Sequence, residues 1–567
     1  MTNIKSRPSR ALIAACVAAL VAATLAVPVG AIDDPESGFR ATEQPIDIPL
    51  QILAINDFHG HINTFSSGFG GTGGAQNLAT NVRAAQEGYE HSILVSAGDL
   101  IGASPLISAL FHDEPTIEAM NLIGLEIAGV GNHEFDEGPE ELLRMQFGGT
   151  HPVDGDLDGD GFGGADFRFL SANVVVDATR KTLFPPFAIK VYNRIPVAFI
   201  GMTLEGTPSI VTPSGVAGLT FLDEVETVNK LIPRLERRGV RAFVILLHEG
   251  GFSDGGDEGD DCEGGLTGPL AEIVPAFDDA VDLVIAGHVN DEFVCEIDGK
   301  WVTMADNAGR LFTNIETTLS RLTGEMSIVA IDNVPNLQSA ADAPDLQALI
   351  DKYDLLSAPL ANTVIGTTTG DITRTANDAG ESALGDVIAD AQLAATDDVG
   401  FGEAVVAFMN PGGIRADVVF APTGAEAPGE LTYGEAFSVQ PFGNSLVTMT
   451  LTGAQIDTLL EQQWVGQTSP RILQVSAGFA YTWDAAAPDG DKVDPATIMI
   501  DGVVVDAATS YRVTVNSFLA DGGDNFFVLV DGTDRLGGEV DLDALVTYFE
   551  LNSPVAPGPQ DRINRLN

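Results

Sequence analysis

The stretch Ile52-Leu-Ala-Ile-Asn-Asp57-Phe-His59-Gly60 is a short apolar run that ends in an aspartate and a histidine. Its apolar part has the length and aliphatic composition of a buried strand. In extended chain an Asp-x-His spacing puts both side chains on one face, because the side-chain period of a strand is two. A lone pair of this kind is more often a surface or capping pair than a metal site. Its meaning therefore depends on the residues at the ends of the other apolar runs.

Four later apolar runs end in residues of the same kinds. Asp99 follows Ser92–Ser96, the sequence Asn132-His133-Glu-Phe-Asp136 follows Ile127–Val130, His248 follows Ala242–Leu247, and His288 and Asn290 follow Val281–Ala286. Chance placement of metal-ligand residues after five successive strands is improbable. Helical patterns over Ala75–Glu87 and Asp223–Arg238 lie between the runs. We therefore expect an α/β layered domain with polar groups gathered at its strand ends.

A pair of metal ions explains this choice of residues. Two cations about 3.5–4 Å apart repel each other, so a shared carboxylate and several neutral ligands are needed to hold them. We expect Asp99 to be the shared ligand. The other predicted ligands are Asp57, His59 and Asn290 for one ion, and Asn132, His248 and His288 for the second. Nitrogen and oxygen ligands without thiolate favour Zn, Mn, Fe or Co.

The motif order D-x-H, G-D, G-N-H-E, H, G-H-x-N resembles the calcineurin-like metallophosphoesterases. The motif GNHEFD and a second domain are similar to their 5′-nucleotidase branch, which includes the secreted bacterial UDP-sugar hydrolases. The resemblance covers about residues 50–535. Many metallophosphoesterases end their last motif in GHxH, whereas this chain has Gly287-His288-Val289-Asn290. An amide at that position is known in the nucleotidase branch, so the departure supports the narrower resemblance.

The resemblance implies an α/β fold in two domains. It implies a two-sheet αββα metallophosphoesterase sandwich over residues 48–335 and a second, α+β, substrate-binding domain over residues 361–550. The apolar periodicity of Ala343–Ser357 predicts one helix in the linker, residues 336–360.

The implied activity is release of phosphate from nucleoside 5′-monophosphates, with UDP-sugars or nucleoside di- and triphosphates as further substrates. A hydroxide shared by the two metals would attack phosphorus in line. His133, oriented by Asp136, would stabilise the phosphoryl oxygens or protonate the leaving group. A close alternative is a 2′,3′-cyclic-nucleotide 2′-phosphodiesterase/3′-nucleotidase, which would share every ligand. An inactive exported nucleotide-binding protein is an alternative of another class.

Three segments of the second region resemble the substrate domain of the same branch, FMNPGGIRADV, VQPFGNSL and NSFLADGGDNF. Taken alone they are weak, because NPGG is an ordinary turn and Phe before Gly is usually core. By the resemblance, Phe442 and Phe518 would stack on the base and Asp524 would accept from the ribose hydroxyls. The remaining predicted contacts to base or phosphate are Asn410, Gly412, Gly413, Arg415 and Asn444, with Arg374 as a further phosphate-facing arginine.

The charge of the chain restricts its partners. Its 567 residues include 28 Lys+Arg against 81 Asp+Glu, a formal net charge of -53. Binding a nucleic acid polymer needs Lys and Arg to neutralise phosphates, so we expect no such partner. An anionic substrate needs local cations to overcome the global field, and metal ions or clustered Arg would supply them. The sequence does not indicate an oligomeric state.

The first 31 residues are typical of a secretory signal peptide. Lys5, Arg7 and Arg10 precede the apolar run Ala11–Val27, and Val29-Gly30-Ala31 offers small residues for cleavage. We expect a secreted protein (extracellular, periplasmic or cell-wall associated) with no membrane span in the mature chain. An uncleaved N-terminal anchor is the alternative. Export agrees with a predicted disulfide between Cys262 and Cys295, although two buried thiols are possible.

An acidic run and several histidines have no motif context. Asp154–Asp160 resembles the first half of a calcium loop but lacks the glutamate at position 12, where Ala165 stands. A weak calcium site and a solvated acidic loop are both open. The histidines without a motif are His61, His91, His112 and His151, and we assign them no role.

Overall fold

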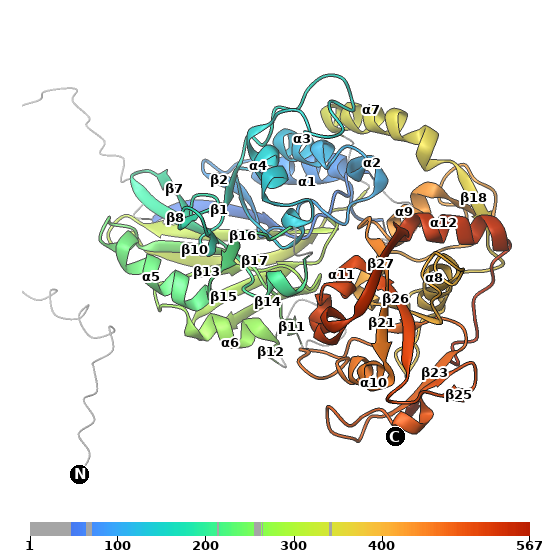
Figure 1. Cartoon of the computed structure of the whole chain (residues 1–567). Helices are drawn as coiled ribbons and strands as arrows, with labels where there is room; N and C mark the ends of the chain where they lie inside the picture. The colour runs from blue at the N-terminus through green and yellow to red at the C-terminus, as the bar shows by residue number, and fades with distance from the viewer. Residues whose placement is uncertain (1–46, 64–70, 212–214, 254–261, 263–264, 339–342) are drawn as a thin grey trace, which may run out of the picture. The chain divides into compact units, whose positions relative to one another are not determined.

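Two six-stranded mixed sheets form the first domain (Figure 1). The first has the order β17-β16-β1-β2-β3-β4, and the second has the order β14-β15-β13-β10-β8-β7. Strands β1 to β4 run parallel in the first sheet, and β8, β10, β13 and β15 run parallel in the second. The strands of the first sheet are β1 Asp47–Ile55, β2 Ser92–Ser96, β3 Ile127–Gly129, β4 Arg168–Leu170, β16 Leu311–Ser320 and β17 Met326–Pro335. Those of the second are β7 Phe187–Tyr192, β8 Ile195–Thr203, β10 Ala242–His248, β13 Leu283–Ile285, β14 Glu292–Ile297 and β15 Lys300–Ala305.

The computed structural model describes residues 47–63, 71–211, 215–253, 262, 265–338 and 343–567. The predicted signal peptide, residues 1–31, lies outside the described residues. In the described part of the chain, no helix is both long enough and apolar enough to cross a membrane.

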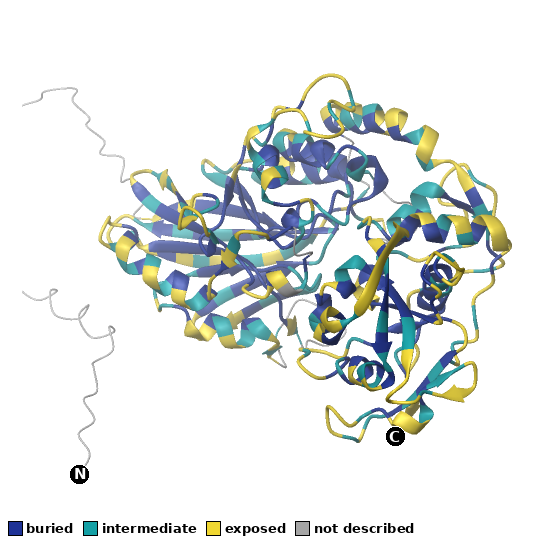
Figure 2. Cartoon of the chain, in the orientation of Figure 1, coloured by how far each residue is buried: buried dark blue, intermediate teal, exposed yellow. Residues whose placement is uncertain are grey.

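Side chains alternate across each strand, so each sheet has an inner and an outer apolar face. In β1, Ile52 packs between the sheets, whereas Leu53 packs outward with the helices over the first sheet. In β10, Leu246 packs inward and Ile245 packs outward. Helices α1 Ala75–Gln86, α3 Glu114–Ile123 and α4 Pro139–Phe147 cover the first sheet, and α5 Glu224–Glu236 and α6 Pro269–Ala276 cover the second. The buried strands lie between these layers (Figure 2), which confirms the αββα sandwich.

Both helices predicted between the strands are present, as α1 and α5. Asp223 caps α5, because its side chain accepts a hydrogen bond from the Glu226 backbone N–H. The amphipathic edge strands of both sheets were not predicted. Other short elements of this domain are α2 Leu106–Ala109, β5 Val174–Val176, β6 Lys181–Thr182, β9 Leu219–Phe221, β11 Phe252–Ser253 and β12 Leu266–Thr267.

The linker helix is α7, Pro344–Ala361. It belongs to the first domain by packing, because Leu346, Ile350 and the fully buried Tyr353 join the apolar core over the first sheet. Arg83 in α1 also pairs with Asp345 at a distance of 2.7 Å. The change of domain therefore falls after α7 rather than within it.

The second domain contains a five-stranded sheet, order β22-β19-β26-β21-β27, and a four-stranded sheet, order β25-β24-β23-β28. Strand β28 pairs with β23 in parallel, so this domain continues past residue 550, the predicted boundary. Its strands are β18 Val364–Thr367, β19 Val406–Met409, β20 Glu430–Thr432, β21 Ser445–Thr452, β22 Gln474–Val475, β23 Phe479–Asp484, β24 Met499–Ile500, β25 Val503–Val504, β26 Ser510–Asn516, β27 Thr533–Val540 and β28 Ile563–Leu566. Its helices are α8 Ala383–Ala394, α9 Tyr433–Val439, α10 Gly453–Glu461, α11 Ser517–Ala520 and α12 Asp541–Asn552.

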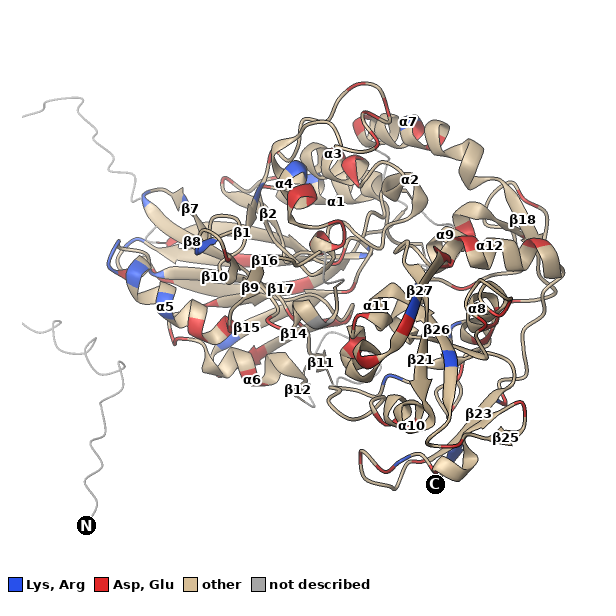
Figure 3. Ribbon diagram, viewed as in Figure 1, with Lys and Arg blue, Asp and Glu red and all other residues tan. Residues whose placement is uncertain are grey.

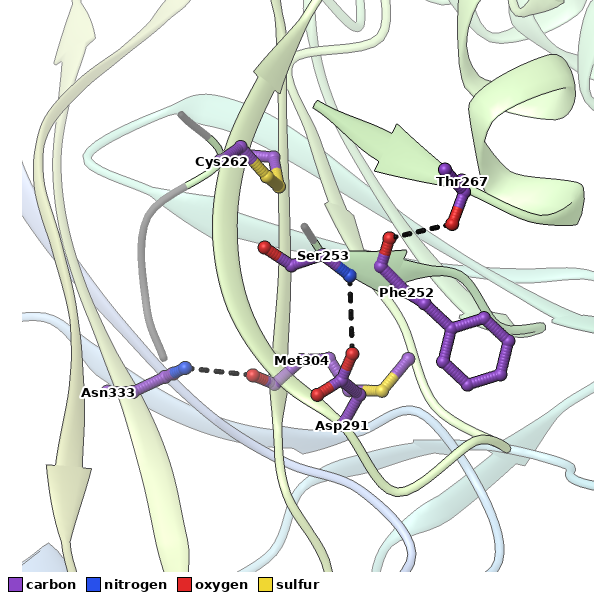
Figure 4. The surroundings of a disulfide bond; sticks show 8 residues. Phe252, Ser253, Cys262, Thr267, Asp291, Met304 and Asn333 are labelled. Atoms are coloured by element: carbon purple, nitrogen blue, oxygen red, sulfur yellow. Dashed lines mark hydrogen bonds between the residues drawn. A yellow bond between two sulfur atoms is a disulfide. The ribbon is translucent and has the colours of Figure 1, made fainter. Parts of the chain in front are cut away.

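A disulfide joins Cys262 to Cys295 in β14 (Figure 4). This is the pairing expected from the sequence. Nearby, the Ser253 backbone N–H donates to Asp291 Oδ2 at 3.3 Å. The disulfide thus links the segment that follows β10 to the strand that follows β13.

Candidate active site

Five parallel strands deliver the predicted metal ligands to one place between the two sheets. Strands β1, β2 and β3 of the first sheet lead to Asp57, Asp99 and Asn132. Strands β10 and β13 of the second sheet lead to His248 and His288. All five side chains come from the carboxyl ends of their strands, where ligands of α/β sheets gather.

The route by which Asp57 and His59 meet differs from the expectation. Strand β1 ends at Ile55, and Asp57 and His59 both have a φ of 47°. The two residues therefore lie in a left-handed loop, and the strand period that the sequence suggested does not position them. Asp99, His288 and Asn290 also have positive φ values. Such backbone strain in non-glycine residues is concentrated at functional sites.

The first group of ligand atoms consists of Asp57, His59 and Asp99, which lie within 4.8 Å of one another. His59 Nε2 is 3.9 Å from Asp57 Oδ1 and 3.8 Å from Asp99 Oδ2. All three residues are buried. This is the set expected for one ion, apart from Asn290.

The second group consists of Asp99, His248 and His288, again within 4.8 Å of one another. His248 Nε2 is 3.0 Å from Asp99 Oδ2 and 3.1 Å from Asn132 Oδ1. His288 Nδ1 is 2.9 Å from the same Asn132 oxygen. Asp99 belongs to both groups, as a shared ligand must.

The remaining nitrogens and oxygens fit a pair of cations. His59 Nδ1 lies 2.9 Å from the Gly102 carbonyl and His248 Nδ1 lies 3.0 Å from the Ala97 carbonyl. When the rings are neutral, donation to these carbonyls leaves the lone pairs on both Nε2 atoms, which face the site as in metal-ligating histidines. Asn290 Oδ1 is buried without a hydrogen-bond partner among the described residues. An unpaired buried oxygen of this kind is stabilised by a cation.

The electrostatics of the site favour added positive charge. Burial would raise the pKa of Asp99, but the facing His248 holds it well below its usual range, so Asp99 is ionised. Burial would lower the pKa of His248, but Asp99 raises it to about 10. Burial lowers the pKa of His288 to about 3, which keeps that imidazole neutral and able to act as a ligand.

His133 and Asp136 lie beside the ligands, on the short 3-10 helix η2 His133–Phe135 and just after it. Asp136 Oδ2 is 2.8 Å from His133 Nδ1, so the carboxylate fixes the ring and leaves Nε2 for another partner. Burial lowers the pKa of His133, but Asp136 and Asp99 outweigh it and the pKa is raised. The ring stacks on Phe442 of the second domain with centroids 5.6 Å apart.

Glu134 holds the loops that carry the ligands. Nothing in the sequence pattern assigned it a role. Its buried carboxylate accepts from the backbone N–H of Asp99 at 3.0 Å, of Leu100 at 2.8 Å and of Gly131 at 2.6 Å. These bonds join the loop after β2 to the loop after β3. The GNHEFD motif contains the residue, but only the folded chain shows its three partners.

A cavity of about 170 Å³ lies next to the ligands and is lined by residues of both domains. Asn132, His133, Asp136 and His288 line it from the first domain. Every predicted substrate-binding residue lines it from the second domain, except Arg374.

Arg374 lies outside the lining of this cavity. Its Nη1 donates to the Ile414 carbonyl at 3.4 Å. The pKa of the half-buried Arg415 is lowered mainly by desolvation, and Arg374 lowers it further. Arg374 therefore lies near Arg415 and acts on the cavity through that residue.

The cavity also contains two polar residues that the sequence did not indicate, Arg471 and Asn516. Arg471 Nη1 pairs with Asp524 Oδ1, and Asn410 Nδ2 donates to Asp524 Oδ2 at 2.9 Å. Asn516 Nδ2 donates to Asn410 Oδ1 at 3.0 Å. Asp524 is thus held from two sides. Arg471 precedes an ordinary strand and carries no local signal.

Two carboxylates of the acidic run, those of Asp158 and Asp160, meet at one point, whereas those of Asp154 and Asp156 have other partners. Asp158 Oδ2 accepts from Lys352 Nζ at 2.6 Å, and Asp160 Oδ2 accepts from the same ammonium at 2.9 Å. Asp156 Oδ1 accepts from the Gly159 backbone N–H at 2.8 Å, and Asp154 faces His112. A lysine therefore stands where the calcium interpretation needed a cation.

Comparisons with known proteins agree with this architecture. The sequence profile of the calcineurin-like phosphoesterases matches residues 50–291, and that of the 5′-nucleotidase C-terminal domain matches residues 364–531. A crystal structure of a 5′-nucleotidase precursor from Thermus thermophilus superposes with a TM-score of 0.72 at 27% identity. That match covers 92% of this chain and 100% of the other.

Two curated relatives cover most of the chain. It is 31% identical over 549 residues to the cell wall protein Lmo0130 of Listeria monocytogenes, a match that covers 91% of this chain and 69% of the relative. It is 30% identical over 537 residues to endonuclease YhcR of Bacillus subtilis, a match that covers 92% of this chain and 41% of the relative. The chain therefore spans less than half the length of that second relative.

A two-sheet sandwich with carboxylate, amide and imidazole groups at its strand ends, matched by this profile, defines a calcineurin-like phosphoesterase, a class of hydrolase. The chain belongs to the branch of that family in which a 5′-nucleotidase C-terminal domain follows the phosphoesterase domain.

Proposed function

We propose that the chain is an exported two-metal phosphohydrolase that releases phosphate from nucleoside 5′-monophosphates. The observation that carries the proposal is the single cavity lined by His133, Asn132 and His288 together with Arg415 and Phe518. Groups suited to phosphate chemistry and groups suited to holding a nucleoside face the same space. UDP-sugars and nucleoside di- and triphosphates are further substrates that this arrangement admits.

The residues that would hold the metals are Asp57, His59, Asp99 and Asn290 for one ion, and Asp99, Asn132, His248 and His288 for the other. Bound divalent ions supply Lewis acidity and lower the pKa of water toward neutrality. Asp57, His59, Asp99, Asn132 and His248 are buried, which limits competition from bulk water.

His133 is suited to proton donation or charge stabilisation at the phosphoryl group. Its Nδ1 is occupied by Asp136, so Nε2 is the nitrogen that can face the substrate. The raised pKa of His133 favours its protonated form. Proton transfer from a positioned side chain contributes about 100- to 10,000-fold in rate.

The second domain supplies cations and aromatic surface. Lys and Arg are sparse on the ribbon (Figure 3), yet Arg415 lines the cavity with its guanidinium carbon 5.9 Å from the centre of the Phe442 ring. This local charge opposes the negative field of the chain and favours a phosphate. Phe518 offers a ring face for the base, where stacking contributes about 1–3 kcal/mol per base. Asp524 offers acceptor oxygens for the ribose.

A second candidate is cleavage of phosphodiesters, such as 2′,3′-cyclic nucleotides, followed by release of the 3′-phosphate. The Bacillus subtilis relative is named an endonuclease, which favours testing this chemistry. The net charge of -53 argues against a long nucleic acid as the substrate. Both candidates would use the same ligands and differ in how the second domain presents the phosphate.

The test is phosphate release by the purified mature chain loaded with Mn²⁺, Co²⁺ or Zn²⁺. We expect turnover of 5′-AMP that is lost on chelation and restored by metal. Equal rates after complete removal of metal would contradict the proposal. Parallel assays with 3′-AMP, 2′,3′-cyclic AMP and a short DNA duplex decide between the candidates.

The variant His133→Asn separates an enzyme from an inactive binding protein. We expect it to bind 5′-AMP as the wild type does and to release phosphate about 100- to 10,000-fold more slowly. His91→Asn is the matched control, because His91 lies away from the cavity against Tyr192 and should leave the rate unchanged. Nucleotide binding with no turnover in the wild type would favour the binding protein.

A further inference from the structure

Two histidines without a motif meet at a second cluster, outside the ligand groups at the strand ends. His112 follows α2, and His151 lies on the loop after α4. Their rings stack with centroids 3.7 Å apart and an interplanar angle of 19°. The ligand atoms of His112, His151 and Asp154 lie within 4.8 Å of one another. Both histidine side chains are mostly buried, and Asp154 is half exposed at the mouth of the cluster.

One nitrogen of each ring points at the same carboxylate oxygen. His112 Nε2 is 3.0 Å from Asp154 Oδ2, and His151 Nδ1 is 3.4 Å from it. The Asp154 backbone N–H donates to His151 Nδ1 at 3.1 Å, so that nitrogen carries a lone pair rather than a proton. A metal ion bound here would take over that lone pair from the backbone N–H and would lie between the ring and the carboxylate, whose lone pairs otherwise repel.

The outer nitrogens of both rings face glutamates. His112 Nδ1 is 2.8 Å from Glu137 Oε2, and His151 Nε2 is 4.0 Å from Glu141 Oε2. Arg144 Nε holds Glu141 in place through 2.9 Å bonds to both of its carboxylate oxygens. The bond from His112 to Glu137 is of the kind by which metal-ligating histidines donate their second N–H to a carboxylate, whereas His151 and Glu141 make a charge contact only.

The balance of charge also requires a cation. Glu137 and Asp154 bring two negative charges to His112, while Glu141 is already paired with Arg144. Two protonated rings stacked at 3.7 Å would repel each other, so the pair can carry one proton at most. A proton on His112 is the competing occupant, because the hydrogen bond with Glu137 is the main cause of its raised pKa.

We propose that His112, His151 and Asp154 bind one divalent transition-metal ion, separate from the pair at the strand ends. Two imidazoles and a carboxylate form a ligand set that suits Zn²⁺, and three protein ligands leave a coordination position for water. Glu137 orients the His112 ring through its hydrogen bond. This site goes beyond the proposed function and does not depend on it.

The site borders the active-site residues without sharing any ligand with them. A cavity of about 110 Å³ is lined by His112, Glu137 and Glu141 and also by Asp136 and Phe442. Glu137 directly follows Asp136, which orients His133. An ion here would tie the loop after α4 to His112, whose ring bonds to Glu137 next to Asp136.

The test is the number of zinc ions bound per chain. Purified mature wild type, His151→Ala and His91→Ala are saturated with Zn²⁺, freed of excess and measured by elemental mass spectrometry. We expect His151→Ala to bind one ion fewer than the wild type, and His91→Ala to match the wild type. No difference between wild type and His151→Ala would overturn the proposal and leave the proton on His112 as the occupant.

Two further variants keep this result interpretable. Asp154→Asn removes a half-exposed ligand, so it should fold even where His151→Ala does not, and should also lose one ion. Asp99→Asn disrupts the pair at the strand ends, and we expect its remaining zinc to be lost when His151→Ala is added. If Asp154→Asn and the wild type bind equal amounts, the proposal is wrong, whatever the fate of the strand-end ions.

Discussion

At the scale of single residues, Glu134 fixes the positions of the two loops that carry Asp99 and Asn132, although it is not itself a proposed ligand. Three backbone N–H groups donate to its carboxylate, two from the loop after β2 and one from the loop after β3. Both of its oxygens are used as acceptors and neither is exposed. An amide cannot replace this arrangement, because its –NH₂ would face backbone donors.

We therefore expect Glu134→Gln to lower the free energy of unfolding by about 1–3 kcal/mol, the cost of leaving a buried donor unpaired. Urea unfolding of the mature chain measures the change. Glu140→Gln is the matched control, because Glu140 is exposed on α4 and should alter stability little. Equal stability of Glu134→Gln and wild type would show that the carboxylate has no such role.

The sequence was informative where chemistry follows a strand, and uninformative where it depends on distant partners. Asp99 and His248 could be predicted because each follows a buried apolar run and parallel strands bring their ends together. Glu134 and Arg471 could not be assigned, because their partners are backbone amides and a carboxylate far along the chain. His112 could not be assigned a role for the same reason, because its partners Glu137 and Asp154 lie elsewhere along the chain. The loop geometry at Asp57 was missed because the run gives no sign of where extension stops.

At the scale of elements, α7 is fastened to the acidic loop by one lysine. Lys352 Nζ bonds to Asp158 and Asp160, and its neighbour Tyr353 also donates to Asp158 Oδ2 at 2.7 Å. The Asp158 side chain is 1% exposed, so its charge depends on these partners. The acidic run alone could not indicate this partner, because the lysine comes from a distant helix.

We expect Lys352→Met to lower the free energy of unfolding by about 1–3 kcal/mol, because a buried carboxylate loses a charged donor. Methionine keeps the helix propensity of α7 nearly unchanged. Lys230→Met is the control, since the exposed pair of Lys230 with Glu226 on α5 contributes about 0.3–0.5 kcal/mol at most. Chemical denaturation measures both. A result for Lys352→Met that matches the control would refute the role of the lysine.

The buried carboxyl group of Asp386, in helix α8, predicts that the stability of the fold depends on pH. Burial is the main cause that raises the pKa of Asp386 in α8 from 3.8 to about 8, with Glu381 adding to it. The folded state therefore holds this proton more tightly than the unfolded chain. Binding of this proton contributes fully to the free energy of unfolding below pH 3.8. That contribution is lost as the pH rises from 3.8 toward about 8.

The variant Asp386→Asn should remove this loss. We expect its free energy of unfolding to fall less than that of the wild type between mildly acidic and mildly alkaline pH. Arg562 keeps its two bonds of 2.7 and 2.8 Å to Asp390, so β28 stays anchored in the variant. Asp397→Asn, at an exposed position, should follow the wild type. Parallel curves for Asp386→Asn and wild type would count against the assignment.

At the scale of the whole molecule, the cavity is lined by both domains. Helix α7 restricts the part of the chain in which one domain can rotate against the other. Because α7 packs into the first domain, a rotation must occur in the short connection between α7 and β18. The Tyr433 backbone N–H at the start of α9 donates to the Thr363 carbonyl in that connection at 2.8 Å. We propose that the connection is a hinge whose opening admits substrate and releases product.

A disulfide engineered between α2 and α9, which lie in contact, should therefore suppress turnover of 5′-AMP. Reduction should restore it. Wild type treated with the same reductant is the control, because its native disulfide meets the same conditions. Full activity of the oxidised variant would exclude hinge opening as a step in turnover.

The proposed strand-end ligands come from both layers of the sandwich, Asp57 and Asp99 from one and His248 and His288 from the other. Ions held there would join the two sheets directly, in addition to their apolar packing and to bonds such as that between His248 and the Ala97 carbonyl. The resistance of a preparation to heat should therefore vary with its ion content. If purification removes the ions, we expect the thermal stability of the protein to fall, and this loss would be detectable before any activity is measured.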